Sequence, residues 1–528
     1  MCYYEYHLFV RMRLFIQNWL KGPYTLMGDE SITKNEPVPH KWLPGDEVDA
    51  DGAVLNRTPP KQILGIVHFV NRTGYGFSPR GAPLYMFYPL HTGYPPFLVS
   101  SKTKPSGNMI ASVSYEHWND KWPRGGIQRL LGAVGDKSAE RQALLQTAAV
   151  GSTDTGDVAE FQLDCASHDT TPWEYVFNID PEGCHDVDDV FAWRKTGDGS
   201  IEFAIAIADV RTWVNEDSVL DKVAYERGTT FYDNGQAVLP MLPPALSAGA
   251  ASLLADGVGR PVLALVYTIR NGVCISHMFR QCIMTVSKAY TYENVLCDTT
   301  VCTMLVGYLT TILGPVCGTD PHHWVELAMV DYNRRVAEVL RRAGVGLLRT
   351  HAGVRSLDWE SLALKTGCAD LAFFGYASGS YVDSTVDDSS HSGLGLKCYT
   401  HASSPLRRYA DLYNQRWFCA AYFGLSNPQY RRLPILLNER NKLAKKLDRA
   451  LWFLDNLDTS GITTVEGWAL VEKTGGVWSV YVPSWKRKVR GIVSQGLVDA
   501  GTRVQVRAYT DLKATSLEAR VVCSIAAL

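Results

Sequence analysis

The chain has 528 residues, of which 46% are hydrophobic and 20% charged, as is typical of a globular protein of several domains. Its formal net charge of −2 argues against a uniformly basic surface, so any surface that binds nucleic acid must be local. The 12 cysteines form no CxxC pair and no zinc-type spacing with histidine. This argues against a structural zinc site and favours reduced thiols in a cytoplasmic or nuclear compartment.

The amino terminus is apolar and aromatic from Met1 to Ile16 and predicts a strand or a helix. Glu5, Arg11 and Arg13 interrupt it too early for a signal peptide or a membrane span, so we expect no membrane partner. Residues from about 36 to 136 form short alternating runs with frequent turns, which predict a small β-barrel. A helix is expected over Ser138–Ala149 and a linker over Gly151–Gly156.

From about residue 173 to 456 the chain mixes apolar strands with long amphipathic helices, notably over Trp324–Leu340 and Leu433–Leu457. This pattern predicts one large α/β domain. After Gly461 short strands return and predict a second small barrel, at Gly467–Val471, Val477–Val482, Gly491–Val493 and Val504–Ala508.

Four aspartates lie within ten residues, between two apolar segments that predict buried strands: Asp180, Asp186, Asp188 and Asp189. Carboxylates held so closely repel one another, and a hard divalent cation bound through oxygen ligands relieves the repulsion. Pro181 and Gly183 favour a turn that brings Asp180 to face the other three. A solvated turn is the alternative, but it would not need apolar strands on both sides. The spacing does not match an EF-hand loop.

The densest polar cluster runs from Tyr399 to Tyr413. Ser404-Pro405 is expected to open a helix with Arg407 and Arg408 in its first turn. Such a turn suits a phosphate, because helix amides and a guanidinium fork both donate hydrogen bonds to it. The alternative is that both arginines lie on a solvated helix surface and that Thr400 and His401 are caps.

Aromatic residues form a third candidate group. Tyr232 lies in a Gly- and Asn-rich loop, and Tyr292 lies in a Tyr-rich segment further on. Both can contact bases or simply fill a core. A cluster near the carboxyl end is typical of a small barrel that binds a single strand, unless its tryptophans fill the barrel core. It comprises Trp468, Trp478, Tyr481, Trp485, Lys486, Arg487, Lys488 and Arg490.

Together these segments resemble the RNB family of exoribonucleases, which includes ribonuclease II, ribonuclease R and the catalytic exonuclease of the eukaryotic exosome. The segment Asp180–Asp189 matches the family's acidic motif at every aspartate. Further segments follow in the family's order: Ala206–Val210, Arg227–Pro243, Arg349–His351, His391–Leu394 and Tyr399–Arg416.

The resemblance implies a multidomain α+β fold in which a central α/β catalytic domain is flanked by OB-fold barrels. The expected domains are a degenerate or truncated first cold-shock-like region at 1–59, a cold-shock-like barrel with a linker helix at 60–150, the catalytic domain at 160–457 and an OB-fold RNA-binding domain at 458–528.

The resemblance also implies a Mg²⁺-dependent 3′→5′ exoribonuclease that hydrolyses single-stranded RNA to nucleoside 5′-monophosphates. One or two Mg²⁺ ions, which Mn²⁺ can replace, would bind Asp180, Asp186, Asp188 and Asp189. The catalytic residues would be Asp186, Asp188 and Arg407, and the RNA-binding residues would be Tyr232, Tyr292, Arg407, Arg408, Lys486 and Arg487. The expected partner is an RNA-degradation complex or a helicase, and otherwise the chain would be a monomer.

The chain departs from the family in two places. Only Ile63–Asp136 resembles a full cold-shock barrel, and Ala251 replaces the usual cysteine. Asp448 lies near a position where relatives often carry a glutamate. Two alternatives stay open: an RNB-fold protein that binds RNA with weak or no catalysis, and a phosphatase that uses the first aspartate of Asp186-Val-Asp188 as its nucleophile.

Overall fold

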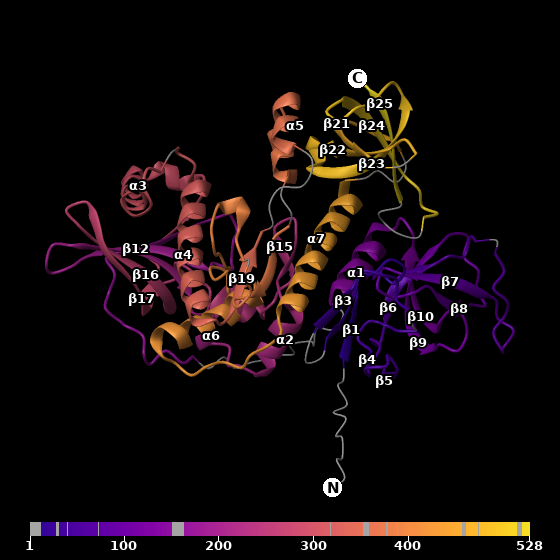
Figure 1. Ribbon diagram of the computed structural model, residues 1–528, viewed down its shortest axis with the longest axis horizontal. Coiled ribbons are helices and arrows are strands. Elements are labelled where there is room, and N and C mark those ends of the chain that lie inside the picture. The colour runs from indigo at the N-terminus through magenta and orange to yellow at the C-terminus, as the bar shows by residue number, and fades with distance from the viewer. Residues whose placement is uncertain are drawn as a thin grey trace, which may run out of the picture. The chain divides into compact units, whose positions relative to one another are not determined.

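The chain folds into two compact units, each assembled from segments that are far apart in the sequence. The first unit comprises Met1–Gly151, Ser361–Asp370 and Lys446–Leu528, and the second comprises Ser152–Glu360 and Leu371–Lys445. The computed structural model (Figure 1) describes residues 12–27, 31–39, 41–71, 73–149, 163–316, 318–351, 358–375, 378–387, 389–456, 461–473, 475–514 and 520–528. No helix within these ranges is both long enough and apolar enough to cross a membrane.

The first described segment is an antiparallel sheet of five strands in the order β3-β2-β1-β4-β5. These strands are β1 (Met12–Ile16), β2 (Tyr24–Met27), β3 (Ser31–Lys34), β4 (Glu47–Val48) and β5 (Val54–Asn56). The sheet has a small core of its own around Leu14, Tyr24 and Trp42. β1 covers the end of the apolar amino-terminal segment, whose residues 1–11 lie outside the described ranges.

A closed barrel follows, as the alternating runs predict. Its order is β10-β8-β7-β6-β9, and its strands are β6 (Ile63–Val67), β7 (Leu84–Pro89), β8 (Phe97–Ser100), β9 (Met109–His117) and β10 (Arg124–Ala133). Phe69, Phe87 and Phe97 fill its core. Helix α1 (Lys137–Ala149) packs on the barrel and confirms the helix expected there. The predicted linker at 151–156 lies outside the described residues.

The second unit is built around a six-stranded sheet in the order β17-β16-β13-β12-β11-β18. All neighbours are antiparallel except β18, which runs parallel to β11. The strands are β11 (Tyr175–Asp180), β12 (Asp189–Lys195), β13 (Ile201–Ala208), β16 (Gly259–Arg270), β17 (Val273–Thr285) and β18 (Lys288–Thr291). Every side chain of β13 from Glu202 to Ala208 is buried, so both faces of the sheet are covered there.

Helices and two small sheets surround this sheet. Figure 1 shows α4 lying across it, and α4 packs on β13 and on α6. The helices of this unit are α2 (Val219–Arg227), α3 (Thr299–Leu313), α4 (Pro321–Ala343), α6 (Tyr409–Phe423) and the first half of α7 (Pro434–Asn456), whereas most of α5 (Trp359–Thr366) belongs to the first unit. The small sheets pair β14 (Phe231–Asp233) with β15 (Gln236–Leu239) and β19 (Leu347–Thr350) with β20 (Ser380–Asp383). α4 and α7 confirm the two long helices expected from the sequence.

The carboxyl-terminal segment closes into a second barrel in the order β21-β22-β23-β25-β24. Its strands are β21 (Thr463–Glu472), β22 (Val477–Val482), β23 (Arg487–Gln495), β24 (Arg503–Thr510) and β25 (Val521–Ala527). Trp478 and Trp485 are part of the barrel core and Tyr481 is buried, so these three rings are unavailable for base stacking. The two barrels and the central sheet confirm the predicted α+β architecture.

Candidate active site

The acidic loop connects two neighbouring strands. β11 ends at Asp180 and β12 begins at Asp189, and the two strands are antiparallel neighbours, so both ends of the loop lie at one edge of the sheet. Gly183 has a φ of 76°, which supplies the predicted turn. Ser252 fixes the loop backbone: its hydroxyl donates to the carbonyl of His185 at 2.6 Å and accepts from the amide of Val187 at 2.9 Å.

The aspartates of this loop repel one another, as the sequence predicts. Burial raises the pKa of Asp180 to about 6, and the charge of Asp186 contributes to this shift. Burial also raises the pKa of Asp189, with added repulsion from Asp180 and Asp188. The Oδ2 atom of Asp180 is buried and has no hydrogen-bond partner among the described residues.

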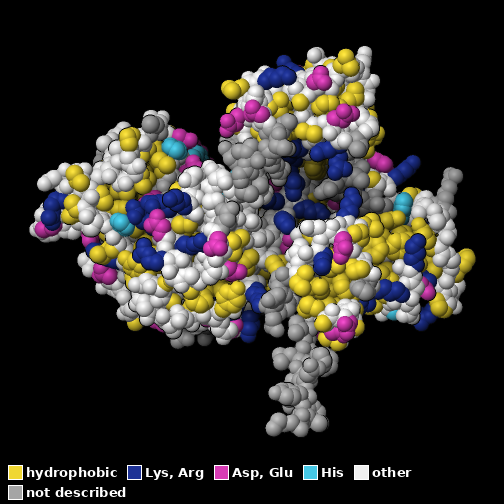
Figure 2. Space-filling model, viewed as in Figure 1, with side chains coloured by type: hydrophobic (Ala, Val, Ile, Leu, Met, Phe, Trp, Pro, Cys, Tyr) yellow, Lys and Arg dark blue, Asp and Glu magenta, His cyan; other side chains and the backbone are white. Residues whose placement is uncertain are grey.

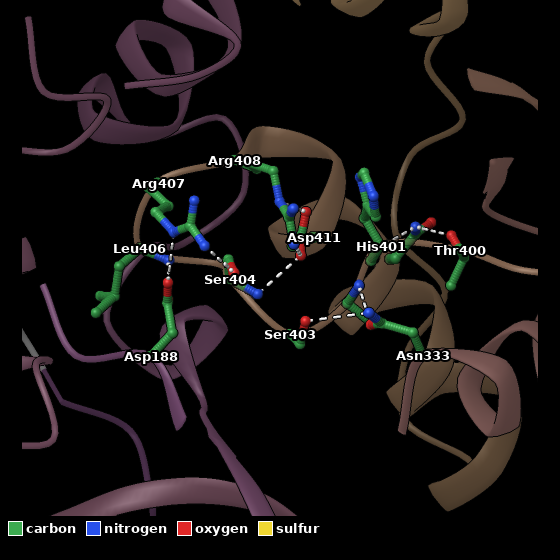
Figure 3. A network of polar contacts seen from close by, with 12 residues as sticks. Asp188, Asn333, Thr400, His401, Ser403, Ser404, Leu406, Arg407, Arg408 and Asp411 are labelled. Atoms are coloured by element: carbon green, nitrogen blue, oxygen red, sulfur yellow. Dashed lines mark hydrogen bonds and ion pairs between the residues drawn. The ribbon is translucent and has the colours of Figure 1, made fainter. Parts of the chain in front are cut away.

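Asp188 joins the acidic loop to the arginine cluster predicted at Tyr399–Tyr413. Its Oδ1 accepts from the amide of Leu406 at 2.9 Å, and its Oδ2 accepts from Nε of Arg407 at 3.2 Å (Figure 3). Arg407 is 219 positions away in the sequence. Burial raises the pKa of Asp188 to about 7, although the charge of Arg407 opposes the shift.

The helix predicted at Ser404-Pro405 begins later. α6 starts at Tyr409 with Arg408 as its N-cap, so Ser404 to Arg408 form a turn that precedes the helix. Asp411 causes the shift, because it accepts from the amide of Ser404 at 2.8 Å and from both Nε and Nη2 of Arg408, at 2.9 and 2.7 Å. Two of the amides expected to bind a phosphate, those of Ser404 and Leu406, therefore bind carboxylates instead.

The two arginines of this turn have different surroundings. The guanidinium of Arg408 is held by Asp411, on the opposite side of the turn from Asp188 (Figure 3). Arg407 donates to Asp188 and to the hydroxyl of Ser404, and 42% of its side chain stays exposed. Arg407 is therefore the arginine that can reach a phosphate.

Neighbouring segments clamp the backbone of the turn. The carbonyl of Arg407 accepts from the amide of Thr230 at 2.8 Å and from the hydroxyl of Thr229 at 3.1 Å. The hydroxyl of Tyr409 donates to Asp221 at 2.9 Å, and Asp221 also holds Arg416 and Arg431. The sequence pattern did not single out Asp221, Thr229 or Thr230, because their partners in this turn and in α6 are remote in sequence. It did not single out Asp411 either, although its partners Ser404 and Arg408 are close in sequence.

Asn333 on α4 supports the segment that leads into the turn. Its amide nitrogen donates to the hydroxyls of Ser403 and Tyr399, both at 3.1 Å, and its oxygen accepts from the amide of Ala402 at 2.8 Å (Figure 3). The hydroxyl of Thr400 donates to the carbonyl of Leu347, so it does not cap α6.

Both candidate tyrosines reach the acidic loop. The hydroxyl of Tyr232 donates to Oδ2 of Asp186 at 2.7 Å, and burial together with this bond raises the pKa of Tyr232. The ring of Tyr292 stacks on His322 with centroids 3.6 Å apart and an interplanar angle of 16°. Burial raises the pKa of Tyr292 to about 12, and the charges of Asp189 and Asp180 contribute to the shift.

The central unit matches one known protein family. A family model described as the RNB domain matches residues 171–297 and 316–423, which include all four aspartates, both tyrosines and Arg407. The chain contains an RNB domain. The resemblance expected from the sequence motifs is thereby confirmed.

Curated relatives match over parts of their length. The chain is 25% identical over 464 residues to the exosome complex exonuclease RRP44 homolog A of Arabidopsis thaliana, covering 69% of this chain and 48% of the relative. It is 29% identical over 217 residues to ribonuclease R 1 of Lactococcus lactis, covering 38% of this chain and 26% of the relative. The chain thus spans about half, or less, of the length of these relatives.

Solved structures share the fold over nearly the whole chain. Mycoplasma genitalium ribonuclease R superposes with a TM-score of 0.69 and 15% identity, covering 98% of this chain and 100% of that one. Yeast Ssd1, described as a pseudonuclease, superposes with a TM-score of 0.67 and 16% identity, covering 95% and 82%. At these identities the likeness establishes the architecture, and it includes both a nuclease and a pseudonuclease.

The RNB domain offers a donor set that suits a hard divalent cation. Asp180, Asp186 and Asp189 supply carboxylate oxygens, which Mg²⁺ prefers. A cation would relieve the repulsion that raises the pKa values of Asp180 and Asp189 and would give the buried Oδ2 of Asp180 a partner. Within the described ranges, however, no three His, Cys, Asp or Glu side chains already converge as a metal-binding group. The oxygens of Asp188 are bonded to Leu406 and Arg407.

The basic residues predicted at the carboxyl end belong to the first unit. Lys486 is exposed and has a φ of 48°, at the end of a short helical turn. Arg487 lies over the rings of Trp452 and Phe453, at 4.8 and 5.6 Å from their centroids, and pairs with Asp448 at 3.5 Å. Arg487 is therefore packed against α7, whereas Lys486 extends into solvent.

Proposed function

We propose that this chain is a Mg²⁺-dependent 3′→5′ exoribonuclease that hydrolyses single-stranded RNA to nucleoside 5′-monophosphates. The hydrogen bond between Asp188 and Arg407 carries the proposal. It joins the acidic loop, which can hold a divalent cation, to a partly exposed guanidinium, which can bind a phosphate. An RNA end that enters this site would meet both groups at once.

Each side chain of the site has a separate role in the proposed hydrolysis. A bound divalent cation supplies a Lewis acid and an activated water for in-line attack on phosphorus. Asp180, Asp186 and Asp189 hold it, and Asp188 orients Arg407 so that its free guanidinium nitrogens face the charge that develops on the scissile phosphate. The hydroxyl of Tyr232 fixes the carboxylate of Asp186. The rings of Tyr232 and Tyr292 then pack against the terminal nucleotides.

The names of similar proteins support the substrate and the kind of partner. Curated relatives are called exosome complex exonuclease and ribonuclease R, and one matching structure of Mycoplasma genitalium ribonuclease R contains ribose-methylated single-stranded RNA. We therefore propose single-stranded RNA as substrate and an RNA-degradation complex as partner. The ten described cysteines are free thiols, which supports the proposed placement in a reducing compartment.

The test uses the full chain and a 5′-labelled single-stranded RNA with a 3′ extension beyond a stem. With Mg²⁺ the label should appear in a ladder that shortens from the 3′ end, with nucleoside 5′-monophosphates released, and EDTA should stop the reaction. Asp189→Asn should lower the rate about a thousandfold or more, because it removes a cation ligand. Asp198→Asn is the matched control, because Asp198 is an exposed aspartate on the β12–β13 turn. Full activity of Asp189→Asn would refute the proposal.

A second function has structural support of its own. Both oxygens of Asp188 are already bonded, and the fold also matches the Ssd1 pseudonuclease. A non-catalytic RNA-binding protein would bind the same RNA tightly in EDTA and release no monophosphate with either Mg²⁺ or Mn²⁺. The ladder experiment separates the two functions directly.

A further inference from the structure

Arg349 is a partly buried cation for which the described part of the chain supplies no carboxylate partner. It lies on β19 opposite Tyr381 of β20, and its guanidinium carbon is 4.7 Å from the centroid of the Tyr381 ring. Its Nη1 atom is buried and has no hydrogen-bond partner among the described residues. Burial lowers the pKa of Arg349, and the charge of Arg408 lowers it further. The acidic residue within electrostatic range, Asp411, is already held by Arg408.

His391 provides a second buried nitrogen without a partner. Its Nδ1 atom is buried and forms no hydrogen bond with a described residue. Its ring stacks on His351 with centroids 4.9 Å apart and contacts Tyr399 at 5.1 Å. A β-bridge pairs His391 with His351, two residues after Arg349. Burial lowers the pKa of His391 to about 4, and the charges of His351 and Arg349 contribute to the shift.

The groups next to Arg349 and His391 include further basic side chains. Burial lowers the pKa of His401, and the charges of Arg408, Arg349 and Arg407 lower it further, so the neutral imidazole is favoured. Its Nδ1 is bonded to the hydroxyl of Tyr381 at 2.7 Å. Burying a guanidinium nitrogen without a partner costs stability, and a ligand that supplies negative charge would offset this cost.

The same cluster is tied to the proposed catalytic turn. The amide of Arg349 donates to the carbonyl of Tyr399 at 2.7 Å, at the start of the segment that leads to Arg407. Gly379 leaves room for the guanidinium: a Cβ there would lie 3.0 Å from Nε of Arg349.

We propose that Arg349 and His391 form a second phosphate-binding subsite. Its ligand is a phosphate group, either one in the backbone of the RNA strand whose scissile phosphate meets Arg407 or the 5′-phosphate of a released nucleotide. The guanidinium fork would donate through Nη1, and the imidazole would donate through Nδ1. The inference rests on the proposed function for the identity of the strand, but the subsite binds phosphate whether or not cleavage occurs.

The first experiment measures RNA binding in EDTA, so that nuclease activity plays no part. Arg349→Met should weaken binding of a 12-nucleotide single strand about tenfold and reduce the slope of log affinity against log salt by about 0.7, the value for one phosphate contact on a single strand. Its melting temperature should not fall, because the variant removes a partly buried charge that has no carboxylate partner among the described residues. Arg270→Met, at an exposed ion pair on β16 of the six-stranded sheet, should leave binding unchanged.

Arg349→Lys covers the case in which Arg349→Met does not fold. Lysine keeps the charge and the aliphatic stem over Tyr381 but loses the planar fork, so this variant should fold and bind RNA several-fold more weakly. His391→Gln should weaken binding as well, and the two losses should be less than additive if both side chains hold one phosphate. Wild-type affinity and salt slope in both Arg349→Lys and His391→Gln would overturn the proposal.

The source of the phosphate is decided by thermal shift with uridine 5′-monophosphate and with inorganic phosphate. Stabilisation of the wild type but not of Arg349→Lys would assign the subsite to a released nucleotide. RNA binding that depends on Arg349, with no shift by either small ligand, would assign it to the strand backbone. If Arg349-dependent binding is found in a chain that fails the ladder experiment, the subsite stands and the nuclease function does not.

Discussion

Tyr232 can orient the carboxylate of Asp186 through its hydroxyl and pack against a base through its ring. The hydroxyl donates to Oδ2 of Asp186, which leaves Oδ1 of the same carboxylate with the more weakly donating thiol of Cys184 at 3.6 Å. The carboxylate is therefore fixed in orientation but keeps one weakly used oxygen for a cation. The face of the ring can pack on a base at the same time.

Tyr232→Phe separates these two tasks, because it removes the hydroxyl and keeps the ring. We expect RNA affinity in EDTA to stay within about twofold of wild type, and kcat to fall about tenfold, which corresponds to one lost hydrogen bond. The Mg²⁺ concentration for half-maximal rate should rise. A titration of rate against Mg²⁺ measures both quantities, and an unchanged Mg²⁺ dependence would show that the ring alone matters.

At the residue scale the sequence was informative about chemistry and uninformative about partners. The four aspartates, Arg407 and Tyr232 were found because their types and spacing carry a chemical reason. The family resemblance set Arg407 apart from Arg408 as a catalytic residue, and in the structure Asp411 takes up the guanidinium of Arg408. Nothing in the local pattern distinguishes the two arginines, since the difference arises from the direction in which each leaves the turn.

At the scale of elements, the β11–β12 connection buries the carboxylates of Asp180 and Asp188 away from water. Burial raises the pKa of Asp180 to about 6 and that of Asp188 to about 7, from an ordinary value of 3.8. Between pH 4 and these values the folded chain keeps protons that the unfolded chain has lost. The stability that these protons provide is complete below about pH 4 and is lost as the pH rises through 6 and 7.

We therefore expect the free energy of unfolding in EDTA to fall between pH 5 and pH 7.5, by on the order of 2 kcal/mol from this loop. Urea denaturation at both pH values measures it, and Mg²⁺ should restore the loss at pH 7.5. Comparison with Asp180→Asn isolates the contribution of Asp180 to this pH dependence. The comparison is needed because histidines with lowered pKa values, such as His391, change the free energy of unfolding in the opposite direction as the pH rises. Equal pH dependence in wild type and Asp180→Asn would contradict the assignment.

The elements that were predicted well are those whose pattern is local. Alternation and turns predicted both barrels, and helical periodicity predicted α1, α4 and α7. The start of α6 was wrong because Asp411 binds the amide of Ser404 and holds the preceding residues in a turn. β12 was not anticipated, since its first residue, Asp189, looked like part of the loop and its place between β11 and β13 is set by pairing.

At the scale of the whole molecule, neither unit is a continuous stretch of sequence. The boundary falls inside α7, whose first half belongs to the unit with the RNB domain and whose last half belongs to the unit with the barrels. Arg487 of the barrel packs on Trp452 and Phe453 of that last half. Such a boundary could not be read from composition, because it depends on contacts between a helix and a barrel that follows it.

The face shown in Figure 2 carries charged side chains of both signs. The net charge of the chain is −2, so RNA binding outside the catalytic site is expected to depend on local groups of exposed cations. Lys486 is such a residue, and its neighbour Arg487 is not, because only 11% of the Arg487 side chain is exposed.

The neighbouring pair Lys486 and Arg487 therefore provides a test of where the carboxyl-terminal barrel contacts RNA. Lys486→Ala should leave the urea midpoint unchanged and lower the salt slope of RNA binding by about 0.7, because one phosphate contact is lost. Arg487→Ala should lower the free energy of unfolding by about 1–2 kcal/mol, since it removes the guanidinium from the rings of Trp452 and Phe453. Its salt slope should match wild type. If the slopes were reversed, Arg487 would have to leave α7 to bind RNA, and the packing seen here would be a state that RNA displaces.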